Sequence, residues 1–586
     1  MHAFSIVLPV HEFKVWAPKP QRVDVYIDGE KHPMLRDDNG WWRLEYPAQD
    51  GDDYGFCLDG GDPIPAPRSA WQPSGAHGLS RLLDHSAFPW TDEQWRGVDQ
   101  IDVIIYEMHV GTFSPKGTFG GAIRKLDHIV KLGATVVELM PVVEFAGDRG
   151  WGYDGVDTFA PHHAYGGPLG LKRLVNECHA RGLGVIMDVV YNHIGAEGNH
   201  LREFGPYITD TPGTPWGESL DLIGAASSEV RKFVADNATM WIRDYHCDGL
   251  RVDAIHALRW EDAIDITKDI CTAVHEIGIQ LGRKTFVAAE DDTNDSSVVL
   301  PPSAGGLGFD AVYANTFQRA LQSTLTGERS GHYAGFEGVR HLVDALHGPW
   351  VYTGQYAHYA RDPEVAIPDI DPARFVVYMQ NHDQVGNREQ GERISSLTSP
   401  GLVRIGAALT LLSPFTPAIF QGEEFSASSP FLFFTDRREL EDPRGVLQGR
   451  INEFRGFGWS DDAVPDPQNP DSFTRSRLPW EELSVREHAN ILRWYQSLIA
   501  LRRRFHMHNQ RFDRAKTLVG SNESWLRVVR FPIAIAVNFT STPAVVPLFP
   551  KVKLLLTSDD KATIEADKAH LPAESVVIAE MRATSA

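Results

Sequence analysis

The sequence predicts an α/β protein, a (β/α)8 TIM barrel with an N-terminal β-sandwich and a C-terminal β-sandwich domain. Three observations predict this fold. The chain has 586 residues, which is too long for a single core, so several domains are expected. Apolar runs alternate with helical stretches through the middle of the chain, a pattern typical of parallel sheets. Both ends instead show short strands separated by turn signals.

Residues 1–97 predict the N-terminal β-sandwich. The stretches 13–16 and 23–27 alternate apolar and polar residues, as strands with one buried face do. Turn signals follow at Asp28-Gly29 and at residues 38–40. Residues 41–46 form a further expected strand, so this region is predicted to be all-β.

Residues 98–508 predict the barrel, because eight apolar runs of strand length follow one another there. The stretch 191–245, after the third run, is too long for a bare βα loop and should carry extra structure. A helix near Val485–Arg504 should close the barrel. The eight expected strands are Val103–Glu107, Val136–Leu139, Gly184–Asp188, Leu250–Asp253, Phe286–Glu290, Phe309–Tyr313, Phe375–Gln380 and Pro417–Gln421.

Residues 509–586 predict a C-terminal β domain. The runs Ile533–Val537 and Val552–Leu556 are short and rich in β-branched or aliphatic residues. They follow the helix that should close the barrel, so they are expected to form a separate small sheet domain.

Four polar blocks lie at the carboxyl ends of expected strands, where barrel proteins place their chemistry. Cleavage of an acetal needs a proton donor for the leaving oxygen and a carboxylate that meets the oxocarbenium-like centre. We predict Asp253 as the nucleophile and Glu290 as the acid/base, while Asp383 would grip the distorted sugar. The sequence therefore predicts a glycoside-cleaving site. The blocks are Asp188–His193, Gly249–Asp253, Ala289–Glu290 and Gln380–Asp383.

Two of these carboxylates also have a structural alternative. Asp253 and Arg251 point the same way on a strand, so Asp253 could serve only as an ion-pair partner. The same pair would keep Asp253 ionised, as a nucleophile requires. Glu290 could cap a helix, but it ends an apolar run, and burial there would raise its pKa toward that of a proton donor.

Two histidines and a tyrosine accompany the carboxylates. His193 and His382 could each donate to a sugar hydroxyl. Tyr153, beside glycines at a strand end, could stack on a sugar ring or, alternatively, anchor the loop. Metal ligation is the alternative for the histidines, and a structural role remains open for His193. No H-E-x-x-H pattern occurs, so we expect no metal or organic cofactor for the chemistry. A structural calcium ion near Asn192 stays open.

Composition excludes several classes of partner. The formal net charge of −22 argues against nucleic acid and anionic membrane surfaces. The four cysteines are scattered and predict reduced thiols in a cytoplasmic protein. Neither a signal peptide nor a run of roughly 18 apolar residues is visible, so we expect no membrane partner. The oligomeric state has no signature in the sequence.

The four blocks resemble the signature regions of the α-amylase superfamily, glycoside hydrolase family 13, and the resemblance covers essentially the whole chain. Within it the chain looks most like the maltooligosyltrehalose trehalohydrolases. His256-Ala257 stands shortly after the nucleophile, where amylases and branching enzymes commonly carry Lys-His. The stretches that carry this closer resemblance are residues 13–18, 71–73, 75–78, 249–256, 381–387, 421–425, 430–431 and 464–468.

The resemblance implies a retaining hydrolase that takes the oligosaccharide maltooligosyltrehalose and releases trehalose and a maltooligosaccharide. It implies a carbohydrate-binding-module-like N-terminal sandwich and no cofactor. Asp253 would be the nucleophile, Glu290 the proton donor and Asp383 the transition-state stabiliser. The expected substrate contacts are Tyr153, Asp188, His193, Arg251, His256, Asn315, His382, Gln384 and Asn387.

One segment departs from the resemblance. The trehalohydrolases usually show Asp-Asp-Phe-His-His after the sixth strand, and residues 315–319 read Asn-Thr-Phe-Gln-Arg instead. These positions would lie on the substrate side, so the residues that recognise trehalose there stay open. Two other functions also stay open. One is a glycogen branching or debranching enzyme of the same superfamily, and the other is a non-catalytic α-glucan-binding protein. The complete set of three carboxylates argues against the second, because a protein that only binds glucan has no need of a placed acid.

Overall fold

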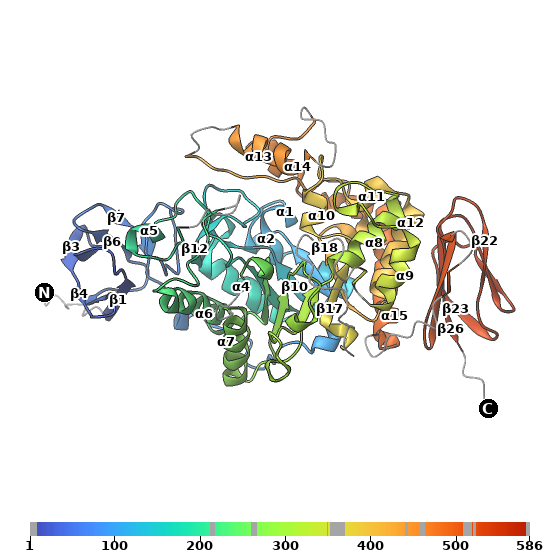
Figure 1. Ribbon diagram of the computed structural model, residues 1–586, viewed down its shortest axis with the longest axis horizontal. Coiled ribbons are helices and arrows are strands. Elements are labelled where there is room, and N and C mark those ends of the chain that lie inside the picture. Colours follow the sequence, from blue (N-terminus) through green and yellow to red (C-terminus); the bar gives the residue numbers. More distant parts are fainter. Residues whose placement is uncertain are drawn as a thin grey trace, which may run out of the picture.

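The computed structural model describes residues 9–210, 217–258, 266–348, 350–351, 370–439, 444–455, 463–507, 518–519 and 523–581. The molecule is elongated, with the barrel in the middle and a β-sheet region at each end (Figure 1). Eight parallel strands close into a barrel in the order β10-β13-β14-β15-β16-β17-β18-β9. The predicted TIM barrel with flanking sheet regions is therefore confirmed.

All eight predicted barrel strands are present, although their ends differ from the predicted ones by one or two residues in most cases. Every barrel strand is buried along its whole length, because the barrel core covers one face and the outer helices cover the other. This burial explains why the strands read as continuous apolar runs. The bounds are β9 Ile105–Met108, β10 Val136–Leu139, β13 Gly184–Val189, β14 Gly249–Val252, β15 Phe286–Ala289, β16 Ala311–Tyr313, β17 Phe375–Tyr378 and β18 Thr416–Phe420.

Helices surround the barrel (Figure 1). The predicted closing helix is α15, which begins one residue later than expected and buries the apolar face that its periodicity indicated. The long helices are α4 Gly167–His179, α6 Ser227–Arg243, α7 Ile266–Leu281, α8 Asn315–Thr326, α12 Pro400–Leu411 and α15 Arg486–Arg504. Shorter helices are α1 Val110–Phe113, α2 Phe119–Ile123, α3 Leu126–Leu132, α5 Leu201–Phe204, α9 Val339–His347, α10 His382–Gly386, α11 Ile394–Leu397, α13 Gly445–Glu453 and α14 Pro470–Arg475.

Two extensions interrupt the βα repeat near the top of the barrel. The predicted extra structure after the third strand contains α5 and two isolated bridges, Ile194 with Glu218 and Ile208 with Leu220. A second extension follows β10 and had not been expected. It is the antiparallel hairpin of β11 Val143–Phe145 and β12 Gly155–Pro161.

Two sheets make up the N-terminal region. One has the order β1-β5-β4, and the other has the order β3-β2-β6-β7 with β8 paired to β6. Tyr207 of the extension after β13 donates to the carbonyl of Trp16 at 3.2 Å, so the sandwich contacts that extension directly. The bounds are β1 Val10–Trp16, β2 Val23–Ile27, β3 Glu30–Pro33, β4 Leu35–Arg36, β5 Trp41–Pro47, β6 Asp53–Leu58, β7 Pro63–Ile64 and β8 Ser80–Arg81.

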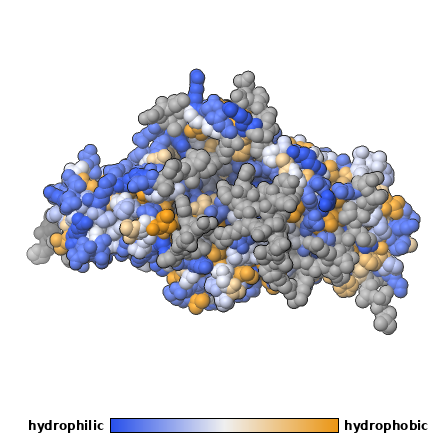
Figure 2. Space-filling view, viewed as in Figure 1, coloured by the Kyte–Doolittle hydropathy of each residue, from blue (hydrophilic) through white to orange (hydrophobic). Residues whose placement is uncertain are grey.

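The C-terminal region also has two sheets, of order β19-β20-β21-β26-β23 and β22-β25-β24. Their bounds are β19 Leu518–Val519, β20 Trp525–Arg530, β21 Ile533–Asn538, β22 Ala544–Pro547, β23 Val552–Thr557, β24 Thr563–Glu565, β25 Lys568–Leu571 and β26 Ser575–Met581. All four cysteines of the chain are buried, and none of them forms a disulfide. Hydrophilic residues cover much of the described surface in Figure 2. Within the described residues, no helix is both long and apolar enough to cross a membrane.

Candidate active site

The predicted catalytic carboxylates come together at the carboxyl ends of the barrel strands. Asp253 and Glu290 are the first residues after β14 and β15, and these two strands are neighbours in the barrel. Asp383 lies in the first turn of α10, two residues after its N-cap Asn381, whose side chain accepts from the amide of Asp383 at 2.8 Å. The barrel thus brings together three carboxylates, of which the first and the last are 130 positions apart in the sequence.

Arg251 is the charged centre of this site. Its side chain is 1 % exposed, and Nη1 donates to both oxygens of Asp188 at 2.9 Å and to Oδ1 of Asp253 at 2.8 Å. Its Nη2 lies 3.0 Å from Oε2 of Glu290. The predicted pair of Arg251 and Asp253 is present. Because one guanidinium contacts both carboxylates, Asp253 and Glu290 lie close to each other.

The environment separates the pKa values of these two carboxylates. Burial raises the pKa of Asp253, but the charges of Arg251 and His193 and a hydrogen bond from Asn192 bring it below its usual value. Burial raises the pKa of Glu290 well above its usual value, and although Arg251 opposes the shift, Asp253 and Asp383 add to it. One group is therefore held ionised and the other protonated, the division that acid/base chemistry requires.

The turn after Asp253 also orients Glu290. Ala254 has φ 42° and ψ 54°, a left-handed conformation that costs energy for a residue with a side chain. In this conformation its amide donates to Oε2 of Glu290 at 3.1 Å. The next amide, of Ile255, donates to the backbone carbonyl of Glu290 at 3.0 Å. The strained turn thus fixes the acid against the strand that carries the nucleophile.

Tyr153 and His382 line the same cavity as Asp253. The Tyr153 hydroxyl donates to Asp188 at 2.6 Å and lies 2.8 Å from Nε2 of His382. Burial lowers the pKa of His382, but Asp383 and Glu107 outweigh burial and raise it to about 9. His382 is therefore an imidazolium at neutral pH, and it places a second positive charge in the site.

Glu107, at the end of β9, had not been singled out from the sequence. Its carboxylate accepts from the backbone amide of His382 at 3.1 Å and pairs with Nδ1 of the same residue. The sequence did offer a signal for Glu107, namely its position. Glu107 ends the first expected strand in the way that Glu290 ends the fifth. Glu107 fixes the ring of His382 and supports its charge.

His193 is engaged on both ring nitrogens. Nε2 lies 2.7 Å from the carbonyl of Tyr153, and Nδ1 pairs with the side chain of Asn192. Asn192 in turn donates to Oδ2 of Asp253 at 3.1 Å. His193 lines the cleft beside Asp253, but these partners favour the structural alternative, in which it positions Asn192 and Tyr153.

Two cavities meet at Asp383 and Asn387. One, of about 170 Å³, contains Asp253 together with Tyr153 and His382. The other, of about 360 Å³, contains Glu290 and has a mostly charged and polar wall. A proton donor acts on the leaving oxygen, so the leaving group belongs in the cavity that contains Glu290.

The remaining predicted contacts differ in their access to these cavities. Asn315 and Gln384 line the Glu290 cavity, and Asn387 lines both. Asp188 and Arg251 are each only 1 % exposed and lie behind the other site residues. His256 lies in the 3-10 turn Ile255–Ala257, 4.0 Å from Asp291, and is not part of the described lining of either cavity.

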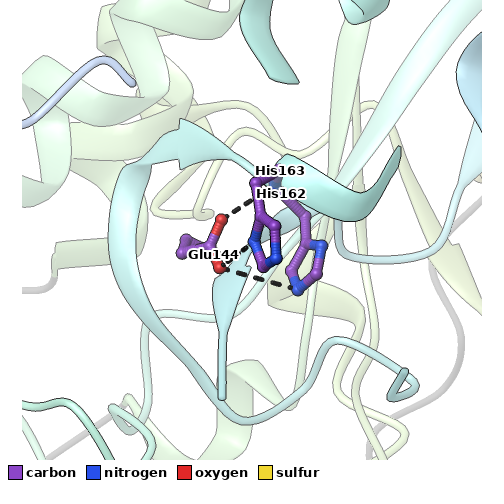
Figure 3. A group of neighbouring side chains, drawn as sticks. All are labelled: Glu144, His162 and His163. Atoms are coloured by element: carbon purple, nitrogen blue, oxygen red, sulfur yellow. Dashed lines mark hydrogen bonds and ion pairs between the residues drawn. The ribbon is translucent and has the colours of Figure 1, made fainter. Parts of the chain in front are cut away.

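Glu144, His162 and His163, at the β11–β12 hairpin, have geometry that could hold a metal ion (Figure 3). Nδ1 of His162 accepts from the amide of Ala164 at 3.1 Å, so the proton of its neutral ring sits on Nε2, the nitrogen nearest Glu144. His163 lies between Glu144 at 2.8 Å and Asp148 at 3.1 Å, and chiefly its bond to Glu144 raises its pKa. The group is therefore an ion-pair cluster that fastens the hairpin.

Comparison with known proteins supports this arrangement. Residues 81–210 match the family model described as the alpha amylase catalytic domain. The chain is 45 % identical over 501 residues to the malto-oligosyltrehalose trehalohydrolase of Arthrobacter ramosus, covering 84 % of this chain and 87 % of that one. It is 39 % identical to the malto-oligosyltrehalose trehalohydrolase of Rhizobium sp. (strain M-11), covering 97 % of both chains.

Solved structures show the same fold. A crystal structure from Salmonella typhimurium, described as an alpha amylase, superposes with a TM-score of 0.88 at 33 % identity. The superposition covers 98 % of each chain, so the likeness includes the two flanking sheet regions as well as the barrel.

Proposed function

Because the chain belongs to the malto-oligosyltrehalose trehalohydrolase family, we propose that it hydrolyses the α-1,4-glucosidic bond next to the trehalose end of maltooligosyltrehalose. The products are trehalose and a maltooligosaccharide. The observation that carries the chemistry is the arrangement of Asp253 and Glu290 on the guanidinium of Arg251, with one pKa lowered and the other raised.

The reaction proceeds in two displacements. Asp253 attacks the anomeric carbon of the glucose unit before the trehalose, while Glu290 gives its proton to the glycosidic oxygen, and trehalose leaves. The ionised Glu290 then takes a proton from water, whose oxygen attacks the same carbon and releases Asp253. The maltooligosaccharide departs with a new reducing end, and both carboxyl groups return to their first state.

The smaller cavity suits the glucose unit that is attacked. Asp383 is 34 % exposed, faces both cavities and lies 3.4 Å from Nε2 of His382. It would grip hydroxyls of the distorted sugar, with His382 and Tyr153 as neighbours on the same wall. Arg251 and Asp188 would act from behind, by holding the carboxylates in place.

The chemistry needs a proton and a carboxylate, so we propose that no metal or organic cofactor takes part. The four cysteines are buried and form no disulfide, which suits a reducing compartment, and we propose a cytoplasmic location on that ground.

Product analysis tests the proposed function. Maltotetraosyltrehalose and maltohexaose are supplied separately, and the products and kcat/KM are measured for each. Roughly ten- to thousand-fold preference for the trehalose-ended substrate is expected, because polar groups fitted to trehalose lose partners when maltose takes its place. Equal kcat/KM values would reject the proposal in favour of a general amylase, and new α-1,6 branches would indicate a branching enzyme. Binding without any turnover would indicate a glucan-binding protein.

A further inference from the structure

Asp292 and Arg319 form an ion pair on the wall of the cavity that contains Glu290. Arg319 lies one turn after Asn315 on α8, so both side chains project from the same face of the helix. Asn315 donates to Oδ1 of Asp292 at 2.6 Å, and Nη2 of Arg319 lies 3.4 Å from each oxygen of the same carboxylate. Asp292 is thus fixed in place, two residues after the proton donor.

Among the described residues, the guanidinium of Arg319 leaves most of its hydrogen-bonding capacity unused. A guanidinium offers five N–H donors, and among the described residues Arg319 uses only Nη2, at long distance and with Asp292 alone. Its side chain is 20 % exposed, and that of Asp292 is 37 % exposed, so both are open to the cavity. The pair therefore presents unused donors beside a carboxylate acceptor.

Arg388, on the same wall, gives a contrast. Its two terminal nitrogens donate to the two oxygens of Glu328 at 3.2 and 2.7 Å, so this guanidinium already has a bidentate partner within the protein. Gln384 also lines this wall, and its Oε1 is a buried acceptor without a hydrogen-bond partner among the described residues. Donors and acceptors left open in one cleft are the pattern expected of a site for a neutral polyhydroxyl ligand, because each sugar hydroxyl both donates and accepts.

We propose that Arg319 and Asp292 are binding residues for the leaving disaccharide, trehalose, with Arg319 donating to its oxygens and Asp292 accepting from its hydroxyls. The inference rests on the proposed function, because that function places trehalose on the Glu290 side of the cleaved bond. The inference goes beyond the proposed function because it assigns the recognition of trehalose to an ion pair that is separate from the catalytic carboxylates.

The test measures binding and turnover separately. Isothermal titration with trehalose, and with maltose for comparison, is done on the Glu290→Gln protein and on the same protein carrying Arg319→Ala or Arg319→Lys. The kcat/KM on maltotetraosyltrehalose is measured with Glu290 intact. Arg340→Ala is the matched control. Arg340 lies on α9, pairs with Glu337, has a side chain that is 68 % exposed, and is not part of the described lining of the cavity.

Arg319→Ala is expected to weaken trehalose binding and to lower kcat/KM by about tenfold to a hundredfold, as loss of charge-assisted hydrogen bonds does. Arg319→Lys should restore only part of the loss, because an ammonium group cannot reproduce the planar fork. Arg340→Ala should leave both quantities unchanged. Thermal unfolding of each variant shows whether the fold is kept.

Two results would overturn the inference, and they differ in what else they reject. In the first result, the wild type releases trehalose, but Arg319→Ala and Arg319→Lys change the trehalose affinity and kcat/KM by no more than about twofold. The ion pair then does not bind the leaving group, while the proposed function stands. If the wild type neither releases trehalose nor prefers the trehalose-ended substrate, the proposed function fails and the inference fails with it.

Discussion

Arg251 holds the catalytic carboxylates together at the scale of single residues. Acids crowded in a buried space would normally take up protons, because like charges repel strongly where water is absent. The guanidinium keeps Asp253 ionised through a hydrogen bond of 2.8 Å from Nη1, and the same nitrogen also donates to Asp188. Burial still raises the pKa of Asp188, to about 6, and leaves that of Glu290 well above its usual value.

Removal of either catalytic group should abolish turnover. We expect Asp253→Asn and Glu290→Gln each to lower kcat by about 10³-fold or more, because one removes the nucleophile and the other the transferable proton. Each change keeps the shape of the side chain, so circular dichroism and the unfolding temperature should show an intact fold. An Asp253→Asn protein with near-normal turnover would end the assignment.

The pH dependence of kcat/KM follows from the two pKa shifts. Asp253 must be ionised, and its lowered pKa keeps it so through mildly acidic conditions. Glu290 must be protonated, and its raised pKa means that activity falls only as the pH rises through that value. We expect full activity on the acidic side of neutrality and an alkaline limb set by Glu290. A profile that instead rises steadily from acidic to alkaline pH would contradict these roles.

The stereochemical outcome follows from the distance between the two carboxylates. Both contact one guanidinium, which suits the roughly 5–5.5 Å separation of enzymes that retain configuration. NMR of the first-formed maltooligosaccharide should therefore show the α-anomer at the new reducing end, before mutarotation. Trehalose is non-reducing and carries no such signal. Initial formation of the β-anomer would show inversion and reject a covalent intermediate on Asp253.

At the scale of elements, close strand packing places the nucleophile. A Cβ atom built on Gly249, the first residue of β14, would lie 1.8 Å from the carbonyl oxygen of Phe286 on β15. Only glycine fits there, because the obstacle is backbone of the neighbouring strand and cannot move aside. The same pair of strands carries Asp253 and Glu290 at its other end.

Gly249→Ala should therefore destabilise the barrel. We expect a loss of about 3 kcal/mol or more in the free energy of unfolding, measured by denaturant titration. Gly120→Ala is the matched control, since Gly120 is exposed in α2 with no heavy atom within 4 Å of the added Cβ, and it should be neutral or slightly stabilising. Equal stability of the two variants would show that β14 and β15 can shift apart.

At the scale of the whole molecule, buried acids are paired with cationic side chains although the chain as a whole stays acidic. The formal net charge is −22, yet the site itself compensates its buried acids with Arg251 and His382. In the Glu144, His162 and His163 cluster, His163 likewise lies between two carboxylates, and chiefly its bond to Glu144 raises its pKa. This cluster has the geometry that could hold a metal ion, and there His163 contacts the carboxylates of Glu144 and Asp148.

Chelation should accordingly leave activity intact. We expect kcat and KM to be unchanged within error after exhaustive dialysis against EDTA, because Glu290 and Asp253 supply the proton and the nucleophile. The unfolding temperature of the dialysed protein gives an independent measurement of any structural ion, including calcium near Asn192. Loss of activity that one specific metal restores would refute this expectation.

The sequence by itself determined the barrel and the placement of the three carboxylates that we propose to be catalytic. Each barrel strand is buried on both faces, so its apolar run is visible locally, and Asp253, Glu290 and Asp383 each follow such a run or begin the helix after it. The β11–β12 hairpin escaped prediction because β11 has only three residues, and because β12, although it has seven, shows neither an apolar run nor strict alternation.

Only the tertiary structure decided which side chains meet. Glu107 and His382 are 275 positions apart, and the Arg319–Asp292 pair joins a helix to the loop of another strand. The contact of His193 Nε2 with the carbonyl of Tyr153, 40 positions away, and the position of His256 outside the described cavity walls likewise depend on the folded chain. Hydrophobic periodicity is a property of adjacent residues, whereas hydrogen bonds and charge compensation are properties of packed elements, so only the folded chain reveals them.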